Sequence, residues 1–478
     1  VAVGKNALTA NTTASGNTAV GTDALDSNTT GSSNTAVGWG TLQATTTGSS
    51  NVAMGRNALY VNTTGSQNTS IGVESLDANT EGANNSALGF GSLGANTTGG
   101  DNSAVGFCAL AANTTGICNI SVGSLSLAAN TTGGKNISIG RKSLTANTTG
   151  GCNTSVGTLA MLSNTEGTEN TAVGYIALSA NTTGCSNTAV GRSSLNANTT
   201  GTQNTALGYA ALDSNTTGGA NVSIGFGSLE DNTTGATNLG SGYCALSSNT
   251  TAADNTAVGA FSLRVNTTGT NNVAVGRSAL IANTTAGDNT AVGRLALAVN
   301  TTGSSNTAVG ADSLDSVTTG DCNTSIGRVA GGNLTTGSNN IAIGYLAGTD
   351  AVGDLVTSTN FIILGNNSHT NAKIKIDWTV TSDLRDKTNF GTVPHGLDFV
   401  NQLKPVSFQF KKSRENDTPT GDVRYGFKAQ DIMALEGENP VIIDNRDTEN
   451  LGYTAGNMVP VLVNAIKELK ARIETLEG

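Results

Sequence analysis

The chain has 478 residues, of which 62 are Gly, while charged residues make up 12% and aromatic residues 4%. So few large apolar side chains exclude a conventional globular core over this length, and so few charges exclude a typical disordered chain. The net charge of −10 argues against nucleic acid as a partner, because phosphates would be repelled. No apolar run approaches the roughly 18 residues of a membrane-spanning helix, so membrane insertion is not expected.

Residues 1–350 repeat one 17-residue phrase, N-T-A-V-G-x-x-A-L-x-x-N-T-T-G-x-x, in 21 copies, the first of which lacks its Asn. Asn occupies every multiple of 17 up to 340, and Gly recurs without exception from 4 to 344. We number each repeat from this Asn as position 0. Because one inserted residue would misalign every ladder, such regularity predicts a parallel β-solenoid or β-roll shaft with one turn per repeat. Its handedness, and whether chains share coils, stay open.

Positions 3 and 8 carry the large apolar side chains of the repeat. Position 3 is aliphatic or Met in all copies except Ser241, and position 8 is Leu in 18 copies. We expect NTAVG to form a short strand, the Gly at position 4 to form a corner, and NTTG to form a turn. Asn at positions 0 and 11 is expected to form amide ladders. Burying two aliphatic side chains per turn gives too little free energy to offset the conformational entropy lost on ordering 17 residues. Several chains are therefore expected to associate laterally and bury more surface.

Six Cys residues are spread through the shaft without a CxxC pair or a neighbouring His. A metal site is therefore not expected, and the sequence suggests no cofactor. We interpret these residues as free thiols, which suits assembly in a reducing cytoplasm. They are Cys108, Cys118, Cys152, Cys185, Cys244 and Cys322.

The segment 351–381 follows the last repeats. Residues 358–380, STNFIILGNNSHTNAKIKIDWTV, are rich in β-branched and aromatic side chains. This composition predicts two or three strands that cap the shaft. The segment is also the candidate receptor-contacting tip of the molecule.

Residues 382–478 form a separate α+β domain by composition, because all five Pro residues of the chain lie there. VSFQF and VRYGF are predicted to form a hairpin, and AQDIMALEG a short helix. The last segment, VLVNAIKELKARIETLEG, is a predicted helix with a coiled-coil-like seam of apolar residues at 4-3-4-3 spacing, expected to pair with copies of itself. The seam residues are Leu462, Ile466, Leu469, Ile473 and Leu476.

Four strings of this domain follow one another in the order SDLRDK, GLDFVNQLKPVSFQF, VRYGFKAQDI and VPVLVNAIKEL. Together they resemble the C-terminal intramolecular chaperone of phage tailspikes and endosialidases, the S74 peptidase family. The resemblance covers residues 382–478. It implies a domain that directs trimerisation and folding and then cuts itself off. The implied nucleophile is Ser382, the implied base is Lys387, and the implied scissile bond is Thr381–Ser382.

Asp383 and Arg385 also match the family string and are candidate supporting residues. The proposed chemistry is reasonable in itself, because a Ser hydroxyl needs a base to take its proton. A Lys side chain can be that base where burial or neighbouring cations lower its pKa. On spacing alone, a solvated polar turn is the preferred explanation of SDLRDK, and it is the match of the remaining domain that favours the Ser–Lys dyad.

The shaft strings NTAVG and NTSIG resemble the short repeats of trimeric adhesin heads and occur similarly in phage tail fibres. The expected protein is therefore a homotrimeric phage tail fibre, assembled in the host cytoplasm and located in the virion. Its expected partner is a host-surface glycan or outer-membrane component, and its only expected enzymatic activity is a single self-cleavage. A bacterial trimeric surface adhesin and an ice-binding solenoid remain alternatives. Polysaccharide cleavage is disfavoured, because the shaft has few aromatic residues and no break holding paired carboxylates.

Overall fold

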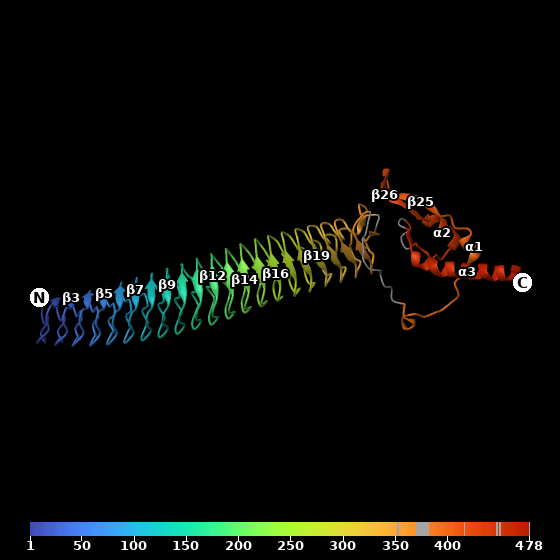
Figure 1. The fold of residues 1–478 in the computed structure, drawn as a ribbon. Helices are drawn as coiled ribbons and strands as arrows, with labels where there is room; N and C mark the ends of the chain where they lie inside the picture. The colour runs from blue at the N-terminus through green and yellow to red at the C-terminus, as the bar shows by residue number, and fades with distance from the viewer. Residues whose placement is uncertain (351–352, 370–381, 415, 446–447, 449–450, 478) are drawn as a thin grey trace.

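The computed structural model describes residues 1–350, 353–369, 382–414, 416–445, 448 and 451–477. A long β-solenoid shaft precedes a small C-terminal domain with helices and short antiparallel sheets (Figure 1). Among the described residues, none of the helices combines the length and the hydrophobicity that a membrane span requires.

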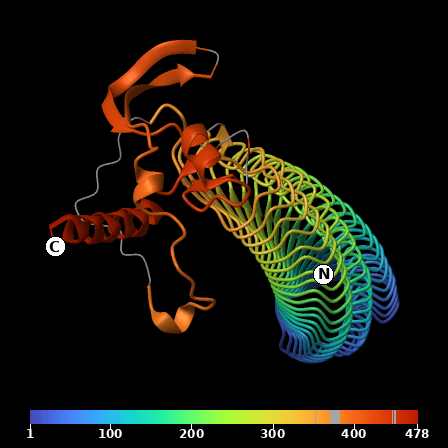
Figure 2. The same ribbon diagram turned by 90° about the vertical axis from the view of Figure 1, so that its right-hand side faces the viewer.

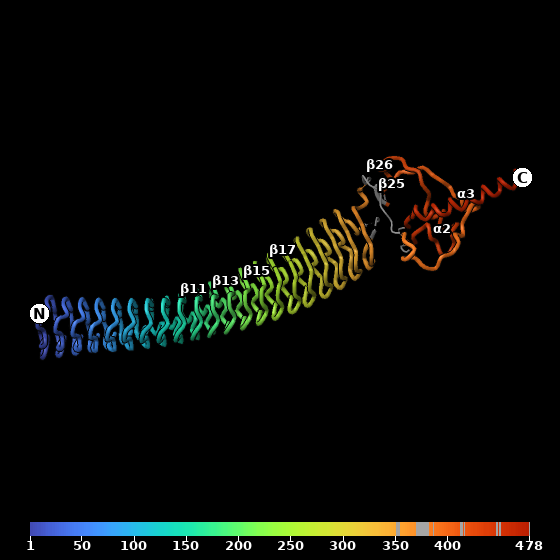
Figure 3. Tube along the Cα trace, turned by 60° about the horizontal axis from the view of Figure 1, so that its bottom comes forward, coloured from blue at the N-terminus to red at the C-terminus, as the bar shows by residue number. Residues whose placement is uncertain are grey.

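The shaft is a parallel β-solenoid in which each 17-residue repeat forms one turn, as predicted. Each strand pairs with the strand one repeat later, so that Thr154 lies opposite Thr171 and Val156 opposite Val173. Successive turns therefore come from one chain, and Figure 2 shows them stacked as similar coils. The stack bends gradually along its length (Figure 3), as expected where parallel strands are rotated slightly from one to the next.

One short strand per turn builds this sheet. The strands are β1 (Ala2–Val3), β2 (Thr18–Val20), β3 (Thr35–Val37), β4 (Val52–Met54), β5 (Thr69–Ile71), β6 (Ser86–Leu88), β7 (Ser103–Val105), β8 (Ile120–Val122), β9 (Ile137–Ile139), β10 (Thr154–Val156), β11 (Thr171–Val173), β12 (Thr188–Val190), β13 (Thr205–Leu207), β14 (Val222–Ile224), β15 (Leu239–Ser241), β16 (Thr256–Val258), β17 (Val273–Val275), β18 (Thr290–Val292), β19 (Thr307–Val309), β20 (Thr324–Ile326) and β21 (Ile341–Ile343).

One further turn follows the last regular repeat. Strand β24 (Ile362–Leu364) pairs in parallel with β21, although it lies 21 residues later instead of 17. The four extra residues are accommodated by a small antiparallel hairpin of β22 (Thr349–Asp350) and β23 (Gly353–Asp354). The coil therefore continues past the boundary predicted at residue 350, because a strand-forming string recurs after the insertion. The rest of the predicted cap, residues 370–381, lies outside the described residues.

The shaft core is narrower than the sequence pattern indicated. Leu178 at position 8 and Ala172 at position 2 are fully buried, whereas Val173 at position 3 is 37% exposed. Neighbouring residues of a strand point to opposite faces, so burial of position 2 turns position 3 outward. Within one chain, the expectation that two large aliphatic side chains per turn are buried is therefore wrong for position 3. The core consists of the Leu ladder and the small residues beside it.

Two ladders of buried Asn side chains run along the shaft, as predicted. At position 0, Asn170 donates its backbone N–H to Oδ1 of Asn153 (3.0 Å) and its Nδ2 to the carbonyl oxygen of Gly184 (2.8 Å). At position 11, Asn164 donates Nδ2 to Oδ1 of Asn147 (2.8 Å). Each amide therefore bonds to a neighbouring turn, which links the turns by side chains as well as by strands.

The Gly at position 4 forms the predicted corner. Gly174 has a φ of +140°, and a Cβ placed on it would lie 2.5 Å from the carbonyl oxygen of Gly191 in the next turn. Both the backbone conformation and the close approach of the turns exclude a side chain here.

The C-terminal domain confirms the predicted hairpin, short helix and long helix. Its small core includes Phe399, Ile432, Ile443 and Met458. Both hairpin strands are longer than predicted, and the last helix begins earlier in the chain. The elements are η1 (Leu384–Asp386), α1 (Leu397–Val400), β25 (Val406–Ser413), β26 (Asn416–Gly426), α2 (Ala429–Glu436), β27 (Ile443–Asp444), β28 (Gly452–Tyr453) and α3 (Ala455–Glu477).

Candidate cleavage site at the start of the C-terminal domain

The structure brings the two residues of the predicted dyad together. Lys387 donates a hydrogen bond from Nζ to Oγ of Ser382 over 2.5 Å. Both side chains are exposed in the single chain. A nucleophile and a base in direct hydrogen-bond contact are the minimum that base-assisted attack by a Ser hydroxyl requires. Thr381, the other side of the predicted scissile bond, lies outside the described residues.

A short 3₁₀ helix, η1, sets the distance between these two residues. The carboxylate of Asp383 caps the helix by accepting the backbone N–H of Arg385 (2.8 Å). At the other end, the backbone N–H of Lys387 donates to the carbonyl oxygen of Leu384. The turn folds the chain back within five residues, so the side chains on either side of it can meet.

The two candidate supporting residues of the string, Asp383 and Arg385, stabilise this turn. Arg385 donates to the Asp383 carboxylate from both Nε (3.0 Å) and Nη2 (2.6 Å). These bonds, together with the backbone N–H of Arg385, hold the pKa of Asp383 below its ordinary value. Asp383 therefore remains an ionised cap, and its contacts assign it to the support of the turn and not to the reacting atoms.

Polar residues of α3 fasten the segment that follows the dyad. Glu468 accepts the backbone N–H of Leu397 at the start of α1 (2.7 Å). Asn464 donates Nδ2 to the carbonyl oxygen of His395 (3.0 Å). The sequence did not predict these contacts, because the partners lie about seventy residues apart and no local pattern connects them. The last helix is thereby tied to the chain shortly after the dyad.

The predicted seam of α3 is exposed in the single chain. The exposed fractions are 40% for Leu462, 67% for Ile466 and 47% for Leu469. The residues that α3 buries in the domain are instead Met458, Val461 and Ala465. The seam therefore remains available to a partner; Ile473 and Leu476 continue it with exposed fractions of 44% and 86%.

No group of three or more His, Cys, Asp or Glu residues with metal-binding geometry occurs within the described ranges. The six Cys residues, all of which lie in the described shaft, are present as free thiols.

Comparison with known proteins identifies the C-terminal region. Residues 382–440 match the peptidase S74 family, described as the chaperone of endosialidase. No curated protein and no solved structure matches the chain. The match begins at Ser382 and includes Lys387, so both dyad residues lie inside it. The chain thus carries an endosialidase-type chaperone domain after a parallel β-solenoid, a combination that fits a tail fibre or an endosialidase-type protein.

Proposed function

We propose that this chain forms the shaft and C-terminal chaperone of a homotrimeric phage tail fibre, which attaches the virion to a glycan or outer-membrane component of the host surface. The observation that carries the proposal is the contact between Ser382 and Lys387 at the first residues of the matched domain. The chaperone directs three chains to associate and fold, and then separates from the shaft by cutting its own chain.

The proposed cleavage begins when Nζ of Lys387, in its unprotonated form, accepts the Oγ proton of Ser382. Oγ attacks the carbonyl carbon of Thr381, and the carbon–nitrogen bond between Thr381 and Ser382 breaks. The released nitrogen of Ser382 takes the proton from Lys387 and becomes a new N-terminus. Water then hydrolyses the ester that joins Oγ to Thr381, which frees the carboxylate of the shaft and restores the hydroxyl.

Association of the chains would supply the burial that Lys387 lacks in the single chain. A Lys side chain acts as a base where burial or neighbouring cations favour its neutral form, and Lys387 is exposed in one chain. Neighbouring copies in the trimer would partly cover this turn and reduce the exposure of Lys387 to bulk solvent. Cleavage would then follow correct assembly and would not occur in an unassembled chain.

Intact mass of the purified full-length protein tests the proposed cleavage. We expect a fragment that begins at Ser382 in the wild type and its absence in Ser382→Ala and Lys387→Ala. The control is Lys404→Ala, an exposed Lys of the same domain, which should be cut like the wild type. Full-length chain in all four proteins would overturn the cleavage and leave a permanent chaperone.

An ice-binding role agrees less well with the shaft geometry. The Thr side chains at position 12 are partly buried and bond to the next turn, as Thr182 does through Oγ1 to the carbonyl oxygen of Thr199 (3.1 Å). Of the Thr rows at positions 12 and 13, the row at position 13, which includes Thr217, is the exposed one. The two rows therefore do not form one flat exposed face that could serve as a template for a crystal of ice. Thermal hysteresis of the purified protein would reverse this ranking.

A further inference from the structure

A continuous apolar strip runs along the outer face of the shaft sheet. Val173, Ile224 and Ile326, all at position 3, are 37%, 40% and 44% exposed. We call the position 3 row the aliphatic stripe. It contains Val3, Val20, Val37, Met54, Ile71, Leu88, Val105, Val122, Ile139, Val156, Val173, Val190, Leu207, Ile224, Ser241, Val258, Val275, Val292, Val309, Ile326 and Ile343. Ser241 is its only polar member, and it contains no charge over 21 turns.

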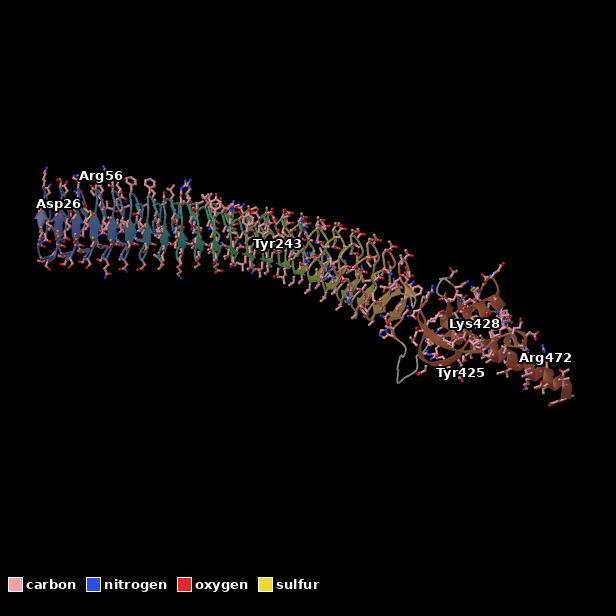
Figure 4. All side chains as sticks on the ribbon, turned by 90° about the horizontal axis from the view of Figure 1, so that it is seen from above. Asp26, Arg56, Tyr243, Tyr425, Lys428 and Arg472 are labelled. Atoms are coloured by element: carbon pink, nitrogen blue, oxygen red, sulfur yellow. The ribbon has the colours of Figure 1, made fainter. Side chains whose placement is uncertain are left out.

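A second exposed row has the opposite character. Position 5 carries aromatic or basic residues in most turns, among them Arg56 and Tyr243, which are labelled in Figure 4. We call this row the aromatic–arginine ridge. Its rings stack along the shaft, with centroids 5.1 Å apart for Tyr209 and Phe226 and 5.3 Å apart for Phe226 and Tyr243. The guanidinium of Arg192 lies 5.7 Å from the ring centroid of Tyr209.

The two rows differ in their suitability for contact between copies. In a parallel assembly in register, each residue near the symmetry axis meets the same residue of the other copies. The basic members of the ridge would then repel their own copies. The stripe brings uncharged side chains together, all of them aliphatic or Met except Ser241. The ridge therefore fits the outside of an assembly, and the stripe fits its inside.

We propose that the aliphatic stripes of three copies pack against one another, parallel and in register, and form a second apolar core along the fibre axis. This inference rests on the proposed homotrimer and adds the surface by which it is built. If full burial of an aliphatic side chain removes about 60–120 Å², then about twenty side chains that are two-fifths exposed offer on the order of 500–1,000 Å² per chain. Stable interfaces bury about 800 Å² per partner.

The stripe cannot by itself set the register of the copies. It is almost the same in every turn, so copies displaced by one turn, about 4.8 Å, would bury nearly the same surface. The part of the chain that does not repeat must therefore select the register. The exposed seam of α3, with Ile466 and Leu469 near its centre, is a self-complementary apolar surface in that part. Selection of the register would therefore fall to the C-terminal domain, whose proposed function is to direct the association of the three chains before their shafts pack.

Disulfide crosslinking of the full-length chain tests the stripe. The native Cys residues are first replaced by Ser, which already occupies the same repeat positions in other turns. Ser241→Cys then places one thiol on the stripe, and Thr217→Cys places the control thiol on an exposed row elsewhere. We expect covalent dimers under mild oxidation for Ser241→Cys and none for Thr217→Cys. Two Cys residues can be bridged only where their Cα atoms lie within about 7 Å.

The possible outcomes separate this inference from the proposed function. A trimer by native mass that forms no Ser241→Cys crosslink, or crosslinks equally at Thr217→Cys, overturns the stripe and leaves the trimeric fibre. A monomer by native mass overturns both. Register is tested by mixing differently tagged Ser241→Cys and Val275→Cys chains during folding. We expect no mixed disulfides, since these positions lie two turns apart, and mixed disulfides as frequent as like ones would overturn the alignment.

Discussion

The Asn ladder at position 11 contains a gap whose repair should stabilise the shaft. Thr45 interrupts the row, and the buried Oδ1 of Asn28 in the turn before it has no hydrogen-bond partner within the described structure. On the other side, Nδ2 of Asn62 reaches Oγ1 of Thr45 only at 3.5 Å, whereas Asn79 donates to Asn62 at 2.8 Å. Thr45→Asn would supply a donor to Asn28 and an acceptor to Asn62.

The expected gain follows from the cost of the orphaned acceptor. A buried polar atom without a partner costs about 1–3 kcal/mol, and part of this is offset by ordering the new side chain, so we expect a stabilisation of about 1–2 kcal/mol. Because each turn contacts only its neighbours, the effect should be local. Native-state hydrogen exchange of the amides around residues 28–62 should slow by about five- to thirtyfold.

Thr45→Val is the matched control, because it keeps the shape of Thr without supplying an amide. Its exchange should not slow. The reasoning is refuted if Thr45→Asn leaves exchange in this region unchanged or faster, or if Thr45→Val slows it equally. The far end of the ladder offers a repeat of the experiment, since Oδ1 of Asn300 is also buried without a partner in the described chain, next to Val317. Val317→Asn should slow exchange there in the same way.

Three further substitutions probe buried or partly buried polar groups of the shaft. Ser228 has a buried Oγ with no partner among the described residues, whereas Ser126 at the same repeat position donates to Oγ of Ser138 (2.8 Å). In the same exchange assay, Ser228→Ala should stabilise its turn by about 1 kcal/mol and Ser126→Ala should destabilise its turn by about as much; equal effects would contradict this. Burial raises the pKa of Asp213, although a hydrogen bond from Asn196 opposes the shift. The folded protein therefore binds this proton more tightly, and stability falls as pH rises from the ordinary value near 3.8 through the raised one. Asp213→Asn should raise the midpoint of thermal unfolding at pH 7 and not at pH 3; a gain of equal size at both would show that charge is not the cause.

The sequence predicted the register of the solenoid because the Gly and the Asn that fix it both contact the neighbouring turn directly. Gly174 and its equivalents stand where neighbouring turns approach too closely for a side chain, and Asn170 and its equivalents bond to the next turn. Replacing the Gly or the Asn would disturb the contacts between neighbouring turns, which explains why the same residue recurs at each of these two positions. The strict recurrence of these residues was therefore a direct sign of stacked turns.

The sequence did not reveal which face of each strand is buried. In the string Thr-Ala-Val, the largest apolar residue is the usual indicator of the core, yet Ala172 is buried and Val173 is exposed. The reason lies outside the strand. Leu178 at position 8 fills the narrow interior in the same core, which leaves space only for a small residue at position 2. A local pattern cannot report a volume that another part of the turn occupies.

The candidate site likewise depends on some contacts between residues close in the sequence and on others between residues far apart in it. The meeting of Ser382 and Lys387 depends on one short turn with its own cap, so both residues lie within one short string, although only the resemblance of the whole domain singled them out as a dyad. The hold of α3 on the following segment depends on Glu468 and Leu397, which are 71 residues apart. No periodicity in the sequence connects such residues, so only the folded chain shows that the last helix holds the segment around His395 and Leu397, which follows the dyad.

A repetitive shaft cannot by itself select the register of its copies, and a non-repetitive domain can. In the proposed trimer, every one-turn displacement of the copies would be nearly equal in energy before assembly, because the aliphatic stripe repeats with the turns. After assembly, a displacement would have to break the contacts of all turns at once, which would make the chosen register kinetically persistent. On this proposal, the information that selects the register is needed during folding and not afterwards. A cut at Thr381–Ser382 would remove the C-terminal domain from its shaft at the point in the chain where its task has ended.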